Sequence, residues 1–497
     1  MSQFDRLVSQ LFRRPGLAHS GSRQLLTRAA TAHATLLRRA AVDSTDRDDA
    51  AGLLPAALLS LIEREPNRGL RRQFLLDPAF IEGLHAAAGL SPSLAAWHTQ
   101  IAEPSIATVF PASTREHAHR LGNSLLALAM RANPNWQGTI LLRTDLYGRL
   151  RFPLSDWTIE LGRFDKQPNA VLADEVVTAT LARRDVRFAA GCGSDHDLLI
   201  IPRSDWLRMI VGNDAAIDGR GISYEQSGVS ARLHFAGKIP GWHVRYEPIA
   251  FTDAGHAGLT GGLAAAILNA IRRNSASIAS EFDGILASVR GWEIPPAAYG
   301  MIQSFSDPTL PRVMGLNVSY AAGDEPQIDP FCFTWFGHEL GHTKSYLIET
   351  ILHVQELSLT TIHGAYTDFV ERYSRRLPIR TLLQIPYTHL YEWALLTDAV
   401  EKGFADLPWT ITADPLAFGE DLYAEIEEAF DLISRDVEPT ACGHAVLARL
   451  WALSKEVLAR WQQVCDSRGL AVLEGRETRA AGRAKRAGGP RPLRPAN

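Results

Sequence analysis

The pentapeptide His338-Glu339-Leu340-Gly341-His342 limits what this chain can fold into more than any other segment. Residues four apart lie on the same face of an α-helix, one turn apart, so both histidines can offer a ring nitrogen to one metal ion. Glu339 lies beside such an ion, where it can hold or deprotonate a bound water molecule. The motif therefore predicts a helix with His338 and His342 as metal ligands and Glu339 as a catalytic residue.

The residues before the motif favour a strand followed by this helix. Residues 312–320 have the composition of a strand. Asp329-Pro330 is typical of a helix start, because an N-cap residue is followed by proline at the first helical position. A strand followed by a metal-binding helix is the local arrangement of zincin-type sites. The alternative is an ordinary amphipathic helix that carries two histidines by chance.

The composition is that of a globular protein. The chain has 497 residues, of which 46% are hydrophobic and 21% are charged, and this length suffices for two or three domains. The net charge of -4 gives no general attraction to nucleic acid, and no apolar run reaches the roughly eighteen residues of a membrane span. The four cysteines are far apart and lack CxxC spacing, which fits a reducing compartment. We expect a cytoplasmic protein without a membrane or nucleic-acid partner.

Changes in residue pattern along the chain predict an α+β fold that is mainly helical. Helical spacing of apolar residues dominates before Pro134, strand-like segments follow it, and one helix is expected at 170–183. Helical spacing then returns, including residues 366–405 and a helical hairpin between 424 and 465. The predicted regions are an N-terminal helical region (1–133), a β-rich region (134–257), a helical metal-binding catalytic region (258–474) and a disordered basic tail (475–497).

The first 42 residues allow two interpretations. They carry seven arginines and one acidic residue, Asp5, together with many alanines, serines and threonines, which resembles the composition of a transit peptide. The same composition suits a pair of amphipathic, arginine-rich helices on the protein surface. We favour the pair of helices.

A metal centre with an open coordination position needs a third protein ligand. His353 lies eleven residues after His342, which is about 16 Å along a continuous helix and too far to share the ion. A glutamate from a following helix would give a gluzincin-type zinc site, whereas a third histidine suits zinc or Fe(II). The residues that remain open for this role are Glu356, His363, His389 and Glu392.

Several residues after the motif occur in an order that resembles a known family. Lys344 follows His342 by two residues, and Pro378, Leu382-Leu383-Gln384, Tyr387 and His389-Leu390 come further on. Residues 330–400 thus resemble bacterial HExxH-motif proteins associated with modification of ribosomally made peptides. That family is described as α-ketoglutarate-dependent, iron-using peptide β-hydroxylases. The chain departs from the family pattern at residues 373–378, which replace Trp-Arg and Asp-Pro-Arg elements.

The resemblance implies a non-haem iron enzyme that acts on a precursor peptide. His338, His342 and His389 would hold Fe(II), while α-ketoglutarate and O2 would take the open positions. The product would be a peptide hydroxylated at a β-carbon. Glu339 has no general-base duty in this chemistry and would instead help to order a ligand.

The cosubstrate's distal carboxylate would need a cationic partner in the protein. A bidentate arginine is the best geometric fit for a carboxylate. Arg376 and Arg380 are the arginines expected to bind the cosubstrate, and Lys344 is expected to have a nearby role.

Two other hypotheses use the same motif. In a zinc metallopeptidase, Glu339 would deprotonate the zinc-bound water, and Tyr346 or Tyr387 would stabilise the oxyanion. The strand at 312–320 would then bind the substrate by edge pairing. In a non-catalytic scaffold the metal would only tie helices together, but such a site is usually closed by four ligands, and Cys332 is poorly placed to complete it.

Overall fold

The structure is a computed structural model of the whole chain. It describes residues 3–16, 20–43, 50–88, 119–144, 148–163, 170–171, 175–190, 197–211, 222–226, 229–247, 254–292, 304–306, 312–317, 332–360, 366–370, 375–405, 407 and 414–470. Within these ranges the chain combines long helices with separate β-sheets, so the predicted α+β, mainly helical class is confirmed. None of the described helices is long and apolar enough to cross a membrane.

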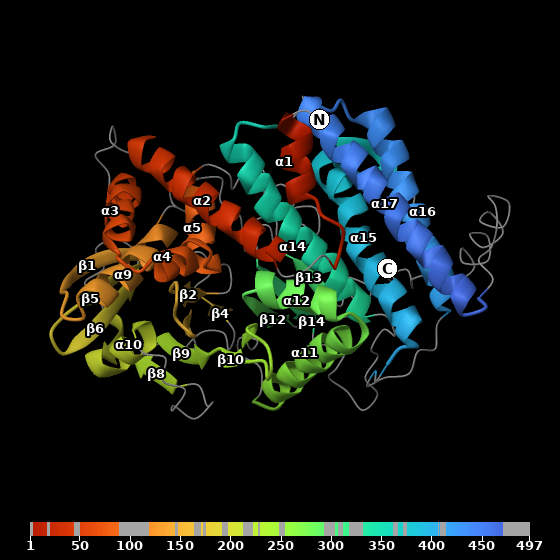
Figure 1. Ribbon diagram of the computed structural model, residues 1–497. Helices are drawn as coiled ribbons and strands as arrows, with labels where there is room; N and C mark the ends of the chain where they lie inside the picture. Colours follow the sequence, from red (N-terminus) through yellow and green to blue (C-terminus); the bar gives the residue numbers. More distant parts are fainter. Residues whose placement is uncertain are drawn as a thin grey trace, which may run out of the picture.

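The largest hydrophobic core joins helices from both ends of the chain (Figure 1). Its helices are α1 (Gln3–Leu11), the first half of α2 (Ser20–Asp43), α11 (Ala254–Asn274), α12 (Ala276–Ile285), α14 (Cys332–Val354), α15 (Ile379–Lys402), α16 (Pro415–Asp436) and α17 (Ala441–Ser467). Helix α15 contacts α14, α16 and α17, so it is the central helix of this group. Helices α16 and α17 confirm the predicted hairpin between 424 and 465.

A mixed five-stranded sheet lies against α14. The strands, in spatial order, are β10 (Gly237–Lys238), β11 (Arg245–Glu247), β12 (Ser288–Trp292), β14 (Val313–Asn317) and β13 (Ser304–Ser306). Strands β11, β12 and β14 are parallel, whereas β13 pairs with β14 in the antiparallel direction. Val289, Met314 and Leu316 belong to the same core as α14.

The predicted strand at 312–320 is β14, and its expected role in substrate pairing is wrong. Strand β14 pairs with β12 on one side and with β13 on the other, so its backbone hydrogen bonds are already used within the sheet. An added peptide strand needs an exposed edge. Among the described strands, the outer one on this side is β13.

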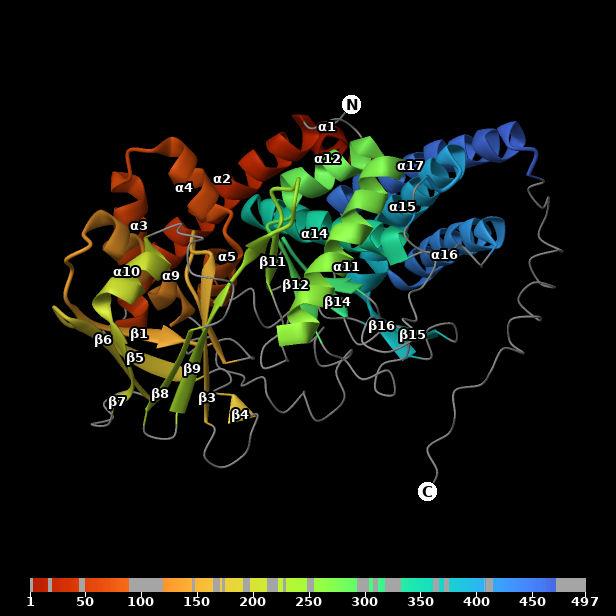
Figure 2. The same ribbon diagram turned by 90° about the horizontal axis from the view of Figure 1, so that it is seen from below.

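The strand-rich part of the chain lies beside the helical body (Figure 2). One sheet has the order β1 (Gly138–Arg143), β5 (Val176–Leu181), β6 (Asp185–Ala190) and β7 (Asp197–Pro202). The other has the order β2 (Arg149–Arg151), β3 (Trp157–Arg163), β9 (Val229–Phe235) and β8 (Ile222–Gln226), with β4 (Ala170–Val171) on β3. Helices α9 (Arg120–Ala132) and α10 (Arg203–Ile210) pack on these strands around a second core.

The predicted N-terminal region is divided between cores. The second half of α2 packs in a third core with α3 (Ala50–Arg64), α4 (Arg68–Leu75), α5 (Pro78–Ala87) and α9. Leu26 of α2 belongs to the large core and Leu37 to the third. Helix α2 therefore connects the large core to the third core. The N-terminal helix pair is present, and α1 packs against α17.

Two predicted helices are strands in the structure. The range 170–183 contains β4 and β5, and the range 366–378 contains β15 (Tyr366–Val370) and β16 (Arg375–Pro378), which pair in the antiparallel direction. In β5, buried residues alternate with half-buried ones, which is the period of a strand. The β-branched residues of this segment also fit a pleated surface better than a helix.

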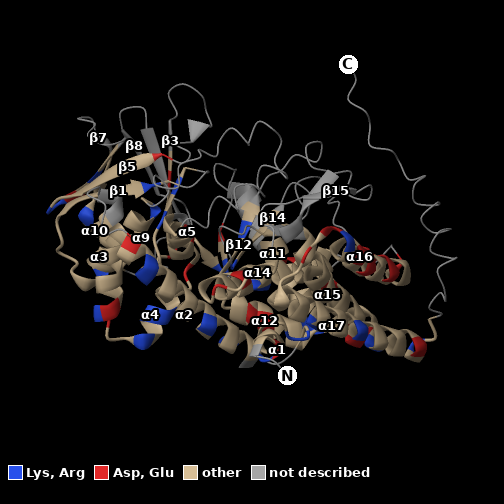
Figure 3. Ribbon diagram, turned by 90° about the horizontal axis from the view of Figure 1, so that it is seen from above, with Lys and Arg blue, Asp and Glu red and all other residues tan. Residues whose placement is uncertain are grey.

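Acidic residues gather on α16 (Figure 3). Helix α15, by contrast, is enclosed, and most of its described residues are buried. Cys332, Cys442 and Cys465 are buried. The predicted N-cap Asp329-Pro330 and the tail 475–497 lie outside the described residues.

Candidate metal centre

Helices α14 and α15 approach closely at two glycines that precede the motif histidines. A Cβ atom on Gly341 would lie 2.7 Å from Cα of Thr388, and one on Gly337 would lie 3.1 Å from the backbone oxygen of Tyr391. Only glycine therefore fits this contact without a shift of the backbone. The close approach places the next residue in each case, His338 and His342, at the interface with α15.

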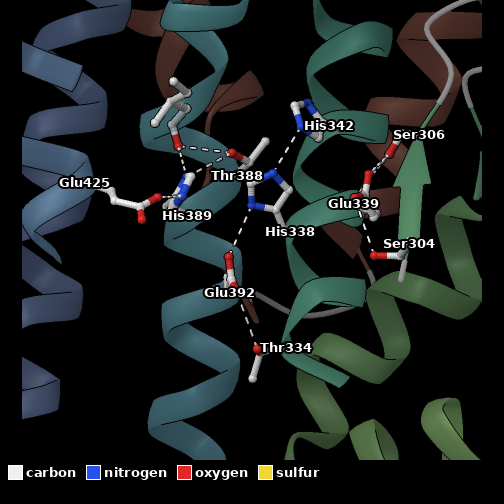
Figure 4. Close-up of polar contacts among 11 residues, drawn as sticks. Ser304, Ser306, Thr334, His338, Glu339, His342, Thr388, His389, Glu392 and Glu425 are labelled. Carbon is white, nitrogen blue, oxygen red and sulfur yellow. Dashed lines mark hydrogen bonds and ion pairs between the residues drawn. The ribbon is translucent and has the colours of Figure 1, made fainter. Parts of the chain in front are cut away.

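The two motif histidines face each other through their ε-nitrogens (Figure 4). His338 Nε2 lies 3.2 Å from His342 Nε2. His338 Nδ1 is 3.2 Å from Glu392 Oε2, and His342 Nδ1 is 3.1 Å from Gln384 Oε1. Because both acceptors are oxygens, each Nδ1 carries the ring proton and donates it. Each Nε2 is then left with a lone pair directed at the other ring.

This arrangement fits a metal ion. Two lone pairs that face each other at 3.2 Å repel, and a cation between them removes the repulsion. Metal–nitrogen bonds of about 2.0–2.1 Å place two ligand nitrogens roughly 3.0 to 3.4 Å apart. Burial and the nearby charge of His389 lower the pKa of His338 to about 3, so its ring is neutral, as a metal ligand must be.

His389 of α15 lies beside His338, with ring centroids 4.8 Å apart. Its Nδ1 donates to the backbone oxygen of Ile385 at 3.0 Å, and its Nε2 contacts Glu425 of α16. Burial lowers the pKa of His389, but the charge of Glu425 and the hydrogen bond to it outweigh burial and raise that pKa. With both nitrogens donating, the ring must lose a proton and part from Glu425 before it can bind a metal.

A group of possible metal ligands among the described residues consists of His338, His389 and Glu392 and does not include His342. One ligand atom each from His338, His389 and Glu392 lies within 4.8 Å of the other two. Burial raises the pKa of Glu392 to about 7, although the charge of His389 opposes this. The carboxylate of Glu392 also accepts from Thr334 at 3.5 Å. Glu392 thus both orients His338 and lies within reach of a metal ion.

Glu339 points away from α15 and toward strand β13 (Figure 4). Its carboxylate accepts hydrogen bonds from the hydroxyl groups of Ser306 and Ser304, the latter at 3.4 Å. Burial raises the pKa of Glu339 to about 7, against the hydrogen bond from Ser306. The motif glutamate is therefore held by the edge strand of the sheet.

Lys344 lies in a different buried network. Its Nζ is 2.6 Å from Glu281 Oε2 of α12 and also contacts the hydroxyl of Tyr391. Burial lowers the pKa of Lys344, but the charges of Glu281 and Tyr387 outweigh it and raise that pKa. The structure places this ammonium between α12, α14 and α15, with its charge already paired.

Among the described residues that were predicted for the site, Glu356 is not brought to the histidines. Glu356 follows the end of α14, has a side chain 82% exposed and pairs with Arg39. His363 lies outside the described residues, and Arg376 and Arg380 lie in β16 and α15 with side chains outside the described part. The two tyrosines proposed for an oxyanion are buried: Tyr346 stacks on the His342 ring, and Tyr387 packs edge-on against Tyr391.

Three features of this centre have no local signal in the sequence. Gln384 is part of the pattern that resembles the family, but the pattern does not indicate that this residue is the acceptor for His342. Glu425 and Ser306 contact the site from helices and strands 36 and 33 residues away from His389 and Glu339. Only the packing of α16 and β13 on the central helices reveals them.

Comparisons with known proteins give no relative from which a role could be transferred. No protein-family model matches the chain, and no curated protein matches its sequence.

Proposed function

We propose that this protein is an Fe(II)- and α-ketoglutarate-dependent oxygenase that hydroxylates the β-carbon of a residue in a ribosomally made peptide. The observation that carries the proposal is the pair of His338 and His342 ε-nitrogens, 3.2 Å apart, each fixed by an acceptor at Nδ1. Imidazole ligands with open positions suit non-haem Fe(II). The resemblance of residues 330–400 to peptide β-hydroxylases favours this chemistry over other uses of such a site.

The residues of the centre are either ligands of the ion or residues that orient these ligands. His338 and His342 bind it through Nε2, and His389 is the third ligand once its contact with Glu425 is released. Glu392 and Gln384 keep the two motif rings in the required tautomer and orientation. When bound, the ion would bind the keto acid and O2 and would provide the chemistry that oxidises the peptide C–H bond.

The position of Glu339 also favours an oxygenase. This chemistry needs no general base beside the ion, and the Glu339 carboxylate is occupied by Ser304 and Ser306. The His338 side chain is 23% exposed, so the centre can be approached by a substrate from solvent. The peptide and the cosubstrate would enter on this side.

The test is an anaerobic titration of metal-free protein with Fe(II) and then α-ketoglutarate. We expect a visible charge-transfer band in the wild type and in His353→Ala, which removes an exposed histidine of the same helix. His338→Ala should give no band. A wild-type protein that takes up Fe(II) but shows no band with α-ketoglutarate would exclude the oxygenase.

A zinc metallopeptidase is the second candidate, and two observations favour it. The pKa of Glu339 is raised to about 7, which is the range that suits a general base at neutral pH. The antiparallel edge strand β13, next to Glu339, is also a place where a peptide could add as a further strand.

Glu339→Gln separates the two candidates. A peptidase should lose about 10²- to 10⁴-fold in peptide cleavage, because it loses its general base. An oxygenase should keep most of its α-ketoglutarate-dependent succinate formation, since this reaction can be measured without a peptide. Succinate formation that disappears with intact Fe(II) binding would give Glu339 a direct role in the oxygenase.

A further inference from the structure

Gln384 of α15 contacts α14 at two points. Its Oε1 is 3.1 Å from His342 Nδ1, and its Nε2 donates to Oε1 of Glu349 at 2.6 Å. His342 and Glu349 are seven residues apart, which is about two turns, so they lie on the same face of α14. Gln384 is only 5% exposed. Its buried amide therefore bridges two positions on one face of the motif helix.

Glu349 decides which end of this amide faces the histidine. A side-chain amide can turn by 180°, which exchanges its acceptor oxygen and its donor nitrogen. A carboxylate offers acceptors only, whatever other groups surround it. The end of the amide that lies 2.6 Å from Glu349 must therefore be the NH2 group, because an oxygen there would face another acceptor. The oxygen of Gln384 is then directed at His342.

The orientation of the amide sets the tautomer of His342. With the amide oxygen toward the ring, Nδ1 carries the proton and Nε2 keeps a lone pair for a metal. If the amide turned, its NH2 group would donate to Nδ1, and the ring proton would move to Nε2. His338 Nε2, which is 3.2 Å away, could then accept that proton. The turned arrangement thus has a hydrogen bond between the two rings and no place for an ion.

The contact with Glu349 favours the metal-binding arrangement. The turned amide would exchange the hydrogen bond to the Glu349 carboxylate for repulsion between two acceptors. A hydrogen bond to a carboxylate is about twice as strong as one between neutral groups, such as the two imidazole rings. The plane of the His342 ring is fixed separately, because Tyr346 stacks on it at an angle of 15°. Glu349 therefore controls the position of the ring proton and not the position of the ring.

We propose that Glu349 is a positioning residue of the metal centre, which acts through Gln384 to keep His342 in the tautomer that binds the ion. Partners of this kind raise the affinity of a site without touching the metal. The proposal rests on the metal centre of the proposed function, but it does not depend on the reaction that the ion carries out. It adds a residue outside both the HExxH motif and the ligands.

The test reads the tautomer of His342 in metal-free protein labelled with ¹⁵N-histidine, because the two tautomers differ in the ¹⁵N chemical shifts of the ring. The His342 signals are those missing from His342→Gln. We expect the Nδ1–H tautomer in the wild type. Glu349→Gln keeps the shape but can present either end of its own amide to Gln384, so both tautomers should appear. Glu349→Lys offers donors only and should leave the His342 proton on Nε2.

A Zn²⁺ competition titration of the same proteins gives the second measurement. The affinity should fall several-fold in Glu349→Gln and about 10- to 100-fold in Glu349→Lys, the range for partners of metal-ligating histidines. Glu356→Gln and Glu356→Lys are the matched controls, because the Glu356 side chain is 82% exposed and pairs with Arg39. Both controls should keep the wild-type tautomer and the wild-type affinity.

Two results would overturn the proposal. One is the Nε2–H tautomer in the wild type. The other is an unchanged tautomer in Glu349→Gln, even where Zn²⁺ binds more weakly, because this would show a general structural effect; it decides the question also if Glu349→Lys does not fold. The expected tautomers in a protein that shows no α-ketoglutarate band on iron would reject the oxygenase and support the role of Glu349.

Discussion

At the scale of single residues, the acceptors on the Nδ1 atoms decide what the motif histidines can do. A histidine four residues from another does not by itself form a metal site, because each ring can rotate and change tautomer. Glu392 and Gln384 remove this freedom for His338 and His342. Both acceptors come from α15, so the centre exists only when α14 and α15 are packed together.

Gln384→Met tests this role, because methionine has a similar shape but no acceptor for the His342 Nδ1–H. We expect metal affinity to fall about 10- to 100-fold, the usual effect of removing a partner of a metal-ligating histidine. A Zn²⁺ competition titration with a chelating dye measures the change. Gln355→Met alters an exposed glutamine just after α14 and should bind metal normally. Equal affinity in both variants would show that Gln384 does not orient His342.

A second histidine, His33 of α2, couples stability to pH. It is fully buried, its Nδ1 is 2.7 Å from the backbone oxygen of Leu75, and burial lowers its pKa to about 4. Between pH 6.5 and 4 the unfolded chain binds a proton that the folded chain does not, so the free energy of unfolding falls as the pH falls. The loss over this window is about 3 kcal/mol.

Urea unfolding of the wild type and of His33→Gln at several pH values in this window measures the effect. The variant should have a shallower dependence of the unfolding free energy on pH. His243→Gln removes a histidine whose side chain is 90% exposed and should keep the wild-type slope. An unchanged slope in His33→Gln would mean that other groups carry the pH dependence.

At the scale of elements, the contact between α14 and α15 depends on small residues. Gly341 makes the closer of the two contacts with α15. A Cβ atom there would meet the backbone of α15 and not a flexible side chain. The same stretch of α15 carries Gln384, His389 and Glu392. A shift of α15 away from α14 therefore changes the packing of the two helices and the metal centre together.

Gly341→Ala should reduce stability by about 1–3 kcal/mol through overpacking, and it should weaken metal binding in the same step. Gly262→Ala is the matched control, because Gly262 lies on the exposed side of α11 with nothing within 4 Å of an added Cβ. It should raise stability by about 0.5–1 kcal/mol, the helix preference of alanine over glycine. Normal metal affinity in Gly341→Ala would show that the centre tolerates movement of α15.

At the scale of the whole molecule, the N-terminal helices support the central helix from outside the catalytic region predicted by sequence. Phe12 is 5% exposed and packs edge-on against Tyr387 of α15, with ring centroids 5.2 Å apart. Arg449 of α17 donates to the backbone oxygen of Phe12 at 3.0 Å. The first residues of the chain are thus part of the core that carries the metal centre.

Phe12→Ala should lower the free energy of unfolding by about 3–5 kcal/mol, because a buried aromatic ring is removed and leaves a cavity. Leu53→Ala removes a side chain that is 61% exposed and should change stability by no more than about 0.5 kcal/mol. Chemical denaturation of both variants checks the expectation. A small effect of Phe12→Ala would mean that α1 docks on the large core only weakly.

The sequence by itself determined the local features. The helix with His338 and His342, the strand before it, several strands between 138 and 235 and the hairpin between 424 and 465 follow from side-chain period and turn residues, which act over a few positions. The helical predictions at 170–183 and 366–378 failed because sheet pairing overrode local preference.

Only the tertiary structure decided which side chains meet. The tertiary structure holds Glu339 at Ser306 of strand β13, Lys344 at Glu281 and His389 at Glu425. Each of these partners comes from another element, at a distance along the chain that no periodic pattern records. Their positions follow from close packing of α14, α15 and the mixed sheet, and packing depends on the shapes of all the elements together.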